Sequence, residues 1–219
     1  MTTYVVRVWL PDRPGALGAV ASRIGAVKGD LVGIDILERG GGLAIDELLV
    51  DLPRADLVPM LVSEVQQVDG VDVEDVRPGT APVDDASRDA LATAVVLVEQ
   101  GTGEGLLAAL AHHAGRGFGA DWAVVVDGEG AATMATEGVP PPAAWLGAFL
   151  AGSRSSERVA SGECGPDDVA WARLPTPDLA LVLGRRGRPF RARERRQLAA
   201  LARIAECRWV ELVATAGAR

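Results

Sequence analysis

Hydrophobic and polar residues alternate at the start of the chain and then change to a helical spacing. In the segment YVVRVW (4–9), Val6 and Val8 point to one side and Arg7 to the other, which is the period of two of a β-strand. After the next glycine, apolar residues recur every three or four positions, the stripe of an amphipathic helix. The intervening PDRPG is therefore expected to be a strand-to-helix turn, in which Pro14 supplies a φ suited to a helix start.

Further strands and a second helix are expected before the pattern changes. Residues 29–38 and 43–52 are expected to form strands joined by the flexible turn RGGG, which makes a hairpin. Residues 54–68 carry a second helical stripe, with Pro59 in its first turn or at a bend, and residues 71–76 alternate like a strand. The order strand, helix, strand, strand, helix, strand is the βαββαβ arrangement of ferredoxin-like folds, so the fold class is α+β.

A stretch rich in Pro, Gly and Asp (78–87) is expected to be a linker between a first domain (1–77) and a second domain (88–219). The second domain is expected to contain an apolar segment at 89–100 that suits either a helix or a buried strand, a helix at 103–119, two strands within 121–138, a helix within 140–153, two strands within 167–186 and a long helix over 191–213. This half is therefore expected to have an α/β composition as well.

Composition and charge narrow the class of protein. The 219 residues are 48% hydrophobic, which is ample for a core, and the net charge of −8 argues against whole-surface binding to nucleic acid or to an anionic membrane. Cys164 and Cys207 have no metal-binding or redox spacing, which favours a reducing compartment. The N-terminus lacks the apolar run of a signal peptide, and no run approaches membrane-spanning length. We expect a soluble, cytoplasmic protein.

Two pieces of the first domain resemble the ACT domain, a small-molecule-sensing module of regulators of amino-acid metabolism. They are DRPGALGAVASRIG (12–25) and GDLVGIDI (29–36), in the order and at the separation of that family. The resemblance implies an amino acid or related effector between the first turn and the start of the second strand, usually at the interface of a homodimer. It implicates the following ligand-binding residues: Asp12, Arg13, Pro14, Gly15, Ala16 and Leu17 on the turn, and Asp30, Leu31, Val32, Gly33 and Ile34 on the second piece.

The chemistry of these two pieces suits a zwitterion. The amides from Gly15 to Gly18 lie at a helix N-terminus and favour a carboxylate, while Asp12 or Asp30 could take an ammonium group. Gly15 is expected to let the backbone pass close to another group. The alternative is that the stretch is only a turn, with Asp12 capping the helix.

One position departs from the family, which commonly has Asn where this chain has Asp30. An Asn side chain both donates and accepts hydrogen bonds, whereas an ionised Asp only accepts. The substitution leaves room for a cationic or otherwise different effector.

Residues 87–215 resemble a GAF domain. The resemblance rests on DLALVLGRRGRPFRARERRQLAALARIAE (178–206), a strand, a short basic turn and a closing helix, and on LLAALAHHAG leading into GADWAVVVDGEG. GAF domains bind cyclic nucleotides, chromophores or other small molecules, or only dimerise. No ligand-specifying signature is present, so the resemblance implies a GAF-like α/β sensor domain without naming a ligand.

Three further motifs have alternative interpretations. The stretch QGTGEG (100–105) mimics a dinucleotide-binding loop if a strand precedes it, but its glycine spacing favours a turn between helices. His112 and His113 are adjacent, face different sides of a helix and cannot chelate a metal together. The arginines between 185 and 196 could bind a phosphate or an acidic partner, but a solvated turn and helix start is favoured.

The sequence shows no nucleophile–base pair, paired-carboxylate motif, Walker loop or metal cluster. We therefore expect a non-catalytic regulatory sensor without cofactor or metal, which binds a small effector, most simply an amino acid, and forms a homodimer. Two alternatives remain open. One is a nucleotide-dependent small enzyme that uses the loop from Gly101 to Gly105, and the other is a dimerisation adaptor without a ligand.

Overall fold

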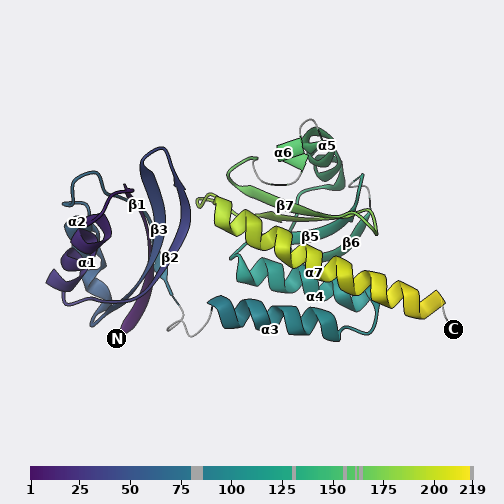
Figure 1. Cartoon of the computed structure of the whole chain (residues 1–219), viewed down its shortest axis with the longest axis horizontal. Helices are drawn as coiled ribbons and strands as arrows, with labels where there is room; N and C mark the ends of the chain where they lie inside the picture. Colours follow the sequence, from purple (N-terminus) through teal and green to yellow (C-terminus); the bar gives the residue numbers. More distant parts are fainter. Residues whose placement is uncertain (80–85, 130–131, 155–156, 161, 163–164, 218–219) are drawn as a thin grey trace. The chain divides into compact units, whose positions relative to one another are not determined.

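The computed structural model describes residues 1–79, 86–129, 132–154, 157–160, 162 and 165–217 (Figure 1). Most of the predicted linker, residues 80–85, lies outside the described residues. The chain divides into two compact units, Met1–Ala86 and Ser87–Arg219. Within the described residues, each unit contains one four-stranded antiparallel sheet with helices packed on it, so the fold class is α+β.

Unit 1 follows the predicted βαββαβ order. Its elements are β1 (Thr2–Pro11), α1 (Ala16–Ala26), β2 (Asp30–Gly40), β3 (Leu43–Leu52), the 3₁₀ turn η1 (Ala55–Leu57), α2 (Val58–Val65) and β4 (Asp72–Pro78). The strand order in the sheet is β2-β3-β1-β4, which is the ferredoxin-like order. Both helices cover the same face of the sheet (Figure 1). Pro59 lies in the first turn of α2, one of its two predicted positions.

The core of unit 1 explains why the alternating pattern folds this way. Val6, Val8 and Leu10 are buried on the helix side of β1. They pack with apolar residues of α1 (Ala16, Val20 and Ile24), of α2 (Leu61 and Val65) and of β3 (Ala44, Leu48, Val50 and Leu52). The period of two in the strands and the spacing of three and four in the helices therefore meet in one apolar layer.

Unit 2 has a sheet with helices on both faces. Its elements are α3 (Ala86–Glu99), α4 (Gly103–Gly117), β5 (Trp122–Asp127), β6 (Thr133–Gly138), α5 (Ala143–Ser153), α6 (Glu157–Ala160), β7 (Val169–Leu174), β8 (Leu179–Gly184) and α7 (Ala192–Gly217). The strand order is β6-β5-β8-β7. Because both faces are covered, the residues 123–126 of β5 are all buried and alternate between two cores. One core is shared with α3, α4 and α7, and the other with α5.

The ambiguous segment 89–100 is helical, because it lies within α3 and buries Leu97 in the core. The glycine-containing loop that follows therefore joins two helices. Thr102 is the N-cap residue of α4, and its hydroxyl accepts a hydrogen bond from the amide of Gly105 at 3.1 Å. A dinucleotide-binding unit needs a strand before such a loop, and a helix stands in that place.

Candidate functional site

The β1–α1 turn has the geometry of an open helix N-terminus. Gly15 is the N-cap residue of α1, with a left-handed φ of 89°. Its carbonyl accepts the amide of Ala19 at 2.9 Å, and the amide of Ala16 donates to the carbonyl of Arg13 at 3.3 Å. The amides of Leu17 and Gly18 follow in the first turn, where the helix supplies no carbonyl partner. Backbone donors at the positive end of the helix dipole are thus available to an anion.

One part of the alternative interpretation of this turn is wrong. Asp12 does not cap α1, because the N-cap position belongs to Gly15 and no side chain makes a capping bond. The amide of Asp12 instead donates to the carbonyl of Gly42 at 2.9 Å, which ties the turn to the β2–β3 hairpin. No described part of the chain approaches Gly15 closely, since a Cβ there would meet no other described atom within 4 Å. Its positive φ is what favours glycine.

The structure places the two predicted pieces of the ligand site at opposite ends of one sheet. Pro11, at the turn, pairs with Leu43 of β3, whereas Asp30, at the start of β2, pairs with Asp51 of β3. These two β3 residues are eight positions apart, which is about 26 Å at about 3.3 Å per residue. Residues 12–17 and 30–34 of the same chain therefore do not form one small-molecule site.

Strand β2, which carries the second piece, is the terminal strand of its sheet. Ile34 is 45% exposed and Ile36 is 37% exposed on this strand. Register shifts in the β2–β3 pairing interrupt the strand between Leu31 and Gly33 and again after Ile36, so the regular stretch 33–36 lies between two bulges. A terminal strand has no neighbouring strand of its own sheet on one side, and the exposed isoleucines add apolar side chains to that edge.

The end of the sheet near the turn contains a buried carboxylate that the sequence-based analysis missed. Asp46 is 3% exposed, and its Oδ1 has no hydrogen-bond partner among the described residues. Burial raises its pKa, the positive charge of Arg39 opposes this change, and the negative charge of Asp12 adds to it. Arg39 and Asp12 are loosely paired and largely exposed, with 3.9 Å between Nε and Oδ1. Three charged groups therefore influence one another beside the α1 N-terminus.

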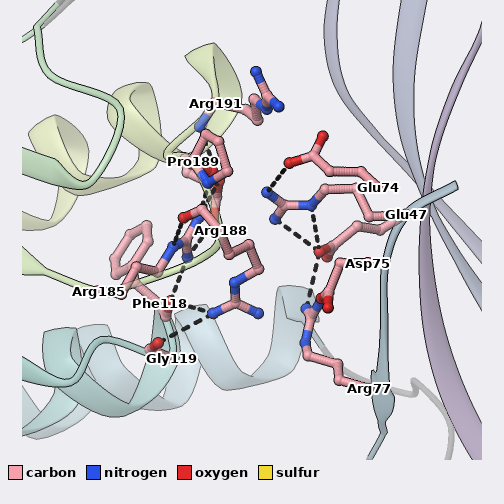
Figure 2. Close-up of polar contacts among 12 residues, drawn as sticks. Glu47, Glu74, Asp75, Arg77, Phe118, Gly119, Arg185, Arg188, Pro189 and Arg191 are labelled. Carbon is pink, nitrogen blue, oxygen red and sulfur yellow. Dashed lines mark hydrogen bonds and ion pairs between the residues drawn. The ribbon is translucent and has the colours of Figure 1, made fainter. Parts of the chain in front are cut away.

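The opposite face of the unit 1 sheet carries an ion network that the sequence-based analysis also missed. Arg7 is buried and donates from Nε and Nη2 to Oε1 of Glu47 at 3.0 and 2.8 Å. Arg77 donates to the same oxygen at 2.9 Å and to Asp75 at 3.2 Å (Figure 2). Burial by itself would raise the pKa of Glu47, but the two guanidinium groups outweigh it and hold this pKa below its usual value. The network binds three strands together.

The arginine-rich segment of unit 2 is solvated only in part, because Arg186 and Arg196 are exposed whereas Arg185 and Arg195 are buried. Arg185 is buried and makes a bidentate ion pair with Glu194, with two contacts of 2.8 Å. It also donates to the carbonyls of Phe118, Arg188 and Pro189 at 2.6 to 2.8 Å (Figure 2). Its guanidinium carbon lies 3.9 Å from the ring centroid of Phe190. Arg185 therefore holds the β8–α7 connection in place. Because its donors are used in these contacts, it is not a candidate phosphate ligand.

The histidines behave as surface groups of α4. Nδ1 of His112 lies 3.1 Å from Oε2 of Glu137, while burial and the neighbouring His112 and Arg116 lower the pKa of His113. No cluster that could hold a metal ion occurs among the described residues. Within the same residues, no helix is both long enough and apolar enough to cross a membrane.

Comparisons with known proteins are limited to distant structural similarity. No family model matches the sequence, and no curated protein matches it. An ACT domain from a GTP pyrophosphokinase of Chlorobium tepidum is 17% identical, with 36% of this chain and 97% of that chain covered and a TM-score of 0.29. An unknown protein from Galdieria sulphuraria is 16% identical, with 57% and 68% covered and a TM-score of 0.32. The ferredoxin-like assignment of unit 1 rests on its own strand order.

Proposed function

We propose that the chain is a non-catalytic regulatory sensor whose unit 1 acts as an ACT domain. It binds an amino acid or a related small effector between two copies of the chain. The single observation that carries the proposal is the separation of the two site pieces within one chain, one of them on the terminal strand of the sheet. Two copies related by a two-fold axis supply what one copy lacks.

Pairing of β2 with β2 of a second copy is the arrangement that joins the pieces. In an antiparallel pairing about a two-fold axis, the residue at the axis lies opposite its own equivalent. Pairing centred on Ile34 or Asp35 therefore sets Asp30 of one copy opposite Glu38 or Gly40 of the other, which are the two sequence neighbours of Arg39. Arg39 is the residue that contacts Asp12 in the β1–α1 turn. The start of β2 in one copy is thereby brought to the turn of the other, and each dimer has two equivalent sites.

The groups collected in this way match the two ends of a zwitterion. The amides of Leu17 and Gly18 at the α1 N-terminus are suited to a carboxylate. Asp30 of the second copy is suited to the ammonium group, because an ionised carboxylate only accepts hydrogen bonds. Asp46 in its ionised form adds negative charge at the same end of the sheet, and its raised pKa would be lowered again by an effector with a cationic group.

Unit 2 is proposed to be a GAF-like domain. The support is its antiparallel sheet, with a helix pair on one face and the long closing helix α7 after the last strand. Neither its ligand nor its output is specified by a recognised signature, so its proposed role is that of a second sensor or a dimerisation domain.

A thermal-shift screen of the full chain against the standard amino acids and nicotinamide nucleotides tests the proposal. A ligand that binds only the native state raises the apparent Tm, by mass action. An increase with one or a few amino acids supports the sensor, and it should be lost in the Gly15→Val variant. An increase with nicotinamide nucleotides alone contradicts it and favours the enzyme. No response from either class also contradicts it and favours the adaptor without a ligand.

A further inference from the structure

Asp46 is a buried hydrogen-bond acceptor in a part of unit 1 that is otherwise apolar. Its side chain lies on the helix-covered face of the sheet, in register with Val8 of β1 and with Ile36 of β2. The residue is 3% exposed, and its Oδ1 has no hydrogen-bond partner among the described residues. Buried side-chain oxygens in folded proteins nearly always accept a hydrogen bond. The chain without a ligand therefore leaves one strong acceptor unsatisfied at this position.

The cover over Asp46 differs between its two sides. Toward β1, Val8 and Ala16 are buried members of the core. Toward β2, which is the terminal strand, Ile36 is 37% exposed and the side chain of Arg39 is 57% exposed. Side chains rather than backbone cover Asp46 on this side, and a ligand would reach it by displacing them. This side also meets the second copy in the β2–β2 pairing proposed above.

The charges that act on Asp46 do not balance. Arg39 of β2 lowers the pKa of Asp46, and Asp12 of the β1–α1 turn raises it. The faces of β1 and α1 that pack around this core are apolar, and the first turn of α1 has no acidic residue. Arg39 is already shared with Asp12, at 3.9 Å between Nε and Oδ1. One guanidinium group thus serves two carboxylates, which leaves an excess of negative charge beside the α1 N-terminus.

Asp46 is not needed for the groups that all amino acids share. In the proposed site, the amides of Leu17 and Gly18 are suited to the carboxylate, and Asp30 of the second copy is suited to the ammonium group. The part of an amino acid that remains is its side chain, and Asp46 offers it an unsatisfied acceptor. A cationic side chain can donate to Oδ1, and such a charge-assisted hydrogen bond is about twice as strong as one between neutral groups.

We propose that the effector is an amino acid with a cationic side chain, and that this side chain pairs with Asp46. The inference rests on the proposed function of unit 1 and adds the class of effector to it. The bound cation supplies the hydrogen bond that Oδ1 lacks and compensates the excess negative charge. Asp46 is thereby a specificity-determining residue of the site.

Matched ligands separate this inference from the proposed function. Calorimetric titration of the full chain compares arginine with citrulline and lysine with norleucine, because each neutral partner has nearly the shape of the cation. At least one cationic amino acid should bind about tenfold more tightly than its neutral partner. If neutral amino acids bind and this preference is absent, the inference is overturned and the proposed function stands. If none of the standard amino acids binds, both are overturned.

The Asp46→Asn variant assigns the preference to this residue. Its amide has nearly the same shape without the charge, so the affinity for the cationic amino acid should fall about tenfold, and that for the neutral partner less than about twofold. Removal of an unsatisfied buried carboxylate should also stabilise the free chain, so unfolding does not explain the loss. Asp69→Asn makes the same change at an exposed position and should leave both affinities unchanged. An unaltered preference in Asp46→Asn would overturn the inference.

The pH dependence of the preference is a readout that a purely structural role of Asp46 would not give. The cation binds the ionised carboxylate, so the preference should decrease as the pH falls through the folded-state pKa of Asp46, which lies above the ordinary 3.8. Titration of Asp30 affects both ligands of a pair alike, so the ratio of their affinities isolates the cationic side chain. This ratio should be smaller at pH 4.5 than at pH 7.5 in the wild-type chain and nearly constant in Asp46→Asn. A constant wild-type ratio would contradict the pairing of the cation with Asp46.

Discussion

Asp46 of β3 lies directly opposite Val8 of β1, on the face of the sheet that carries the apolar core. The side chain of Asp46 thus lies on the same face of β3 as those of Ala44 and Leu48, which belong to the apolar core. The raised pKa shows that ionised Asp46 costs stability at pH values above its folded-state pKa. A buried carboxylate beside a candidate ligand site is a group that a bound cation would stabilise.

Asp46→Asn should therefore stabilise the protein without ligand at neutral pH. We expect a gain of about 1 kcal/mol, because an ionised group with an unsatisfied buried oxygen is replaced by a neutral one. The gain should shrink as the pH falls through the folded-state pKa and then below the ordinary value of 3.8, since Asp46 becomes protonated first in the folded and then in the unfolded state. Urea unfolding at pH 7 and at pH 3.5 measures this, with the exposed Asp69→Asn as control. A loss of stability at pH 7 would contradict the assignment.

Glu47→Gln should have the opposite effect on stability. The pKa of Glu47 is lowered in the folded state, so its contribution is present above the unfolded value of 4.5 and is lost as the pH falls through the folded value. We expect a loss of about 3 kcal/mol at pH 7, because the buried guanidinium of Arg7 loses the carboxylate that accepts two of its hydrogen bonds. The variant and wild-type curves should approach each other in acid. Glu64→Gln, which breaks the more exposed pair with Arg23, should cost less than about 1 kcal/mol.

Gly15→Val should abolish effector binding and destabilise unit 1. A side chain at φ 89° is strained by about 1–2 kcal/mol, and a β-branched one should distort the turn that presents the α1 amides. Gly25→Ala is the matched control, because this position near the C-terminal end of α1 has a normal φ and its Cβ would meet no described atom within 4 Å. Calorimetric titration with the amino acid found by screening should show binding to Gly25→Ala and none to Gly15→Val. Wild-type affinity in Gly15→Val would mean that the turn has no part in binding.

Asp30→Asn should weaken the binding of a zwitterionic amino acid by about tenfold, as expected when a charged partner of the ammonium becomes neutral. Calorimetry of this variant, with Asp69→Asn as control, measures the change. Tighter binding would show instead that the site lacks the amide that is common in the family, and that Asp30 does not hold the ammonium. Unchanged affinity would place the effector elsewhere.

Ile34→Lys should disrupt the β2–β2 interface and, with it, effector binding. A lysine at the centre of the edge stretch places charge where two copies would meet. Sedimentation of the full chain measures this. The wild-type chain should be a dimer at micromolar concentration, and Ile34→Lys should be a monomer. A wild-type chain that is a stable monomer at this concentration would contradict pairing through the strand edge.

Much of unit 1 could be predicted from the sequence, because each element buries one face against a common core. Val6 and Val8 define the buried side of β1 by simple alternation, and the spacing of Val20 and Ile24 does the same for α1. Asp46 could also have been found, since it lies in the apolar phase of LAIDELLVDL. The pattern alone did not reveal whether a partner would satisfy its carboxylate.

Other features were decided by tertiary structure. The composition of the segment 89–100 suits either a helix or a strand. In the folded chain the segment is helical, and Leu97 is buried against α4 and α7. Arg185 belongs to a run of arginines that resembles a solvated turn, yet carbonyls from Phe118 and Pro189 converge on it only in the folded chain.

The candidate ligand site illustrates the same division. The sequence by itself determined the turn at Gly15 and the strand that begins at Asp30, because local backbone preferences and hydrophobic period set both. The distance between them was decided only by the antiparallel pairing of β1 and β2 with β3, which puts the two pieces at opposite ends of the sheet. Which strands pair with one another depends on contacts between residues far apart in the sequence, and a local hydrophobic pattern does not predict those contacts.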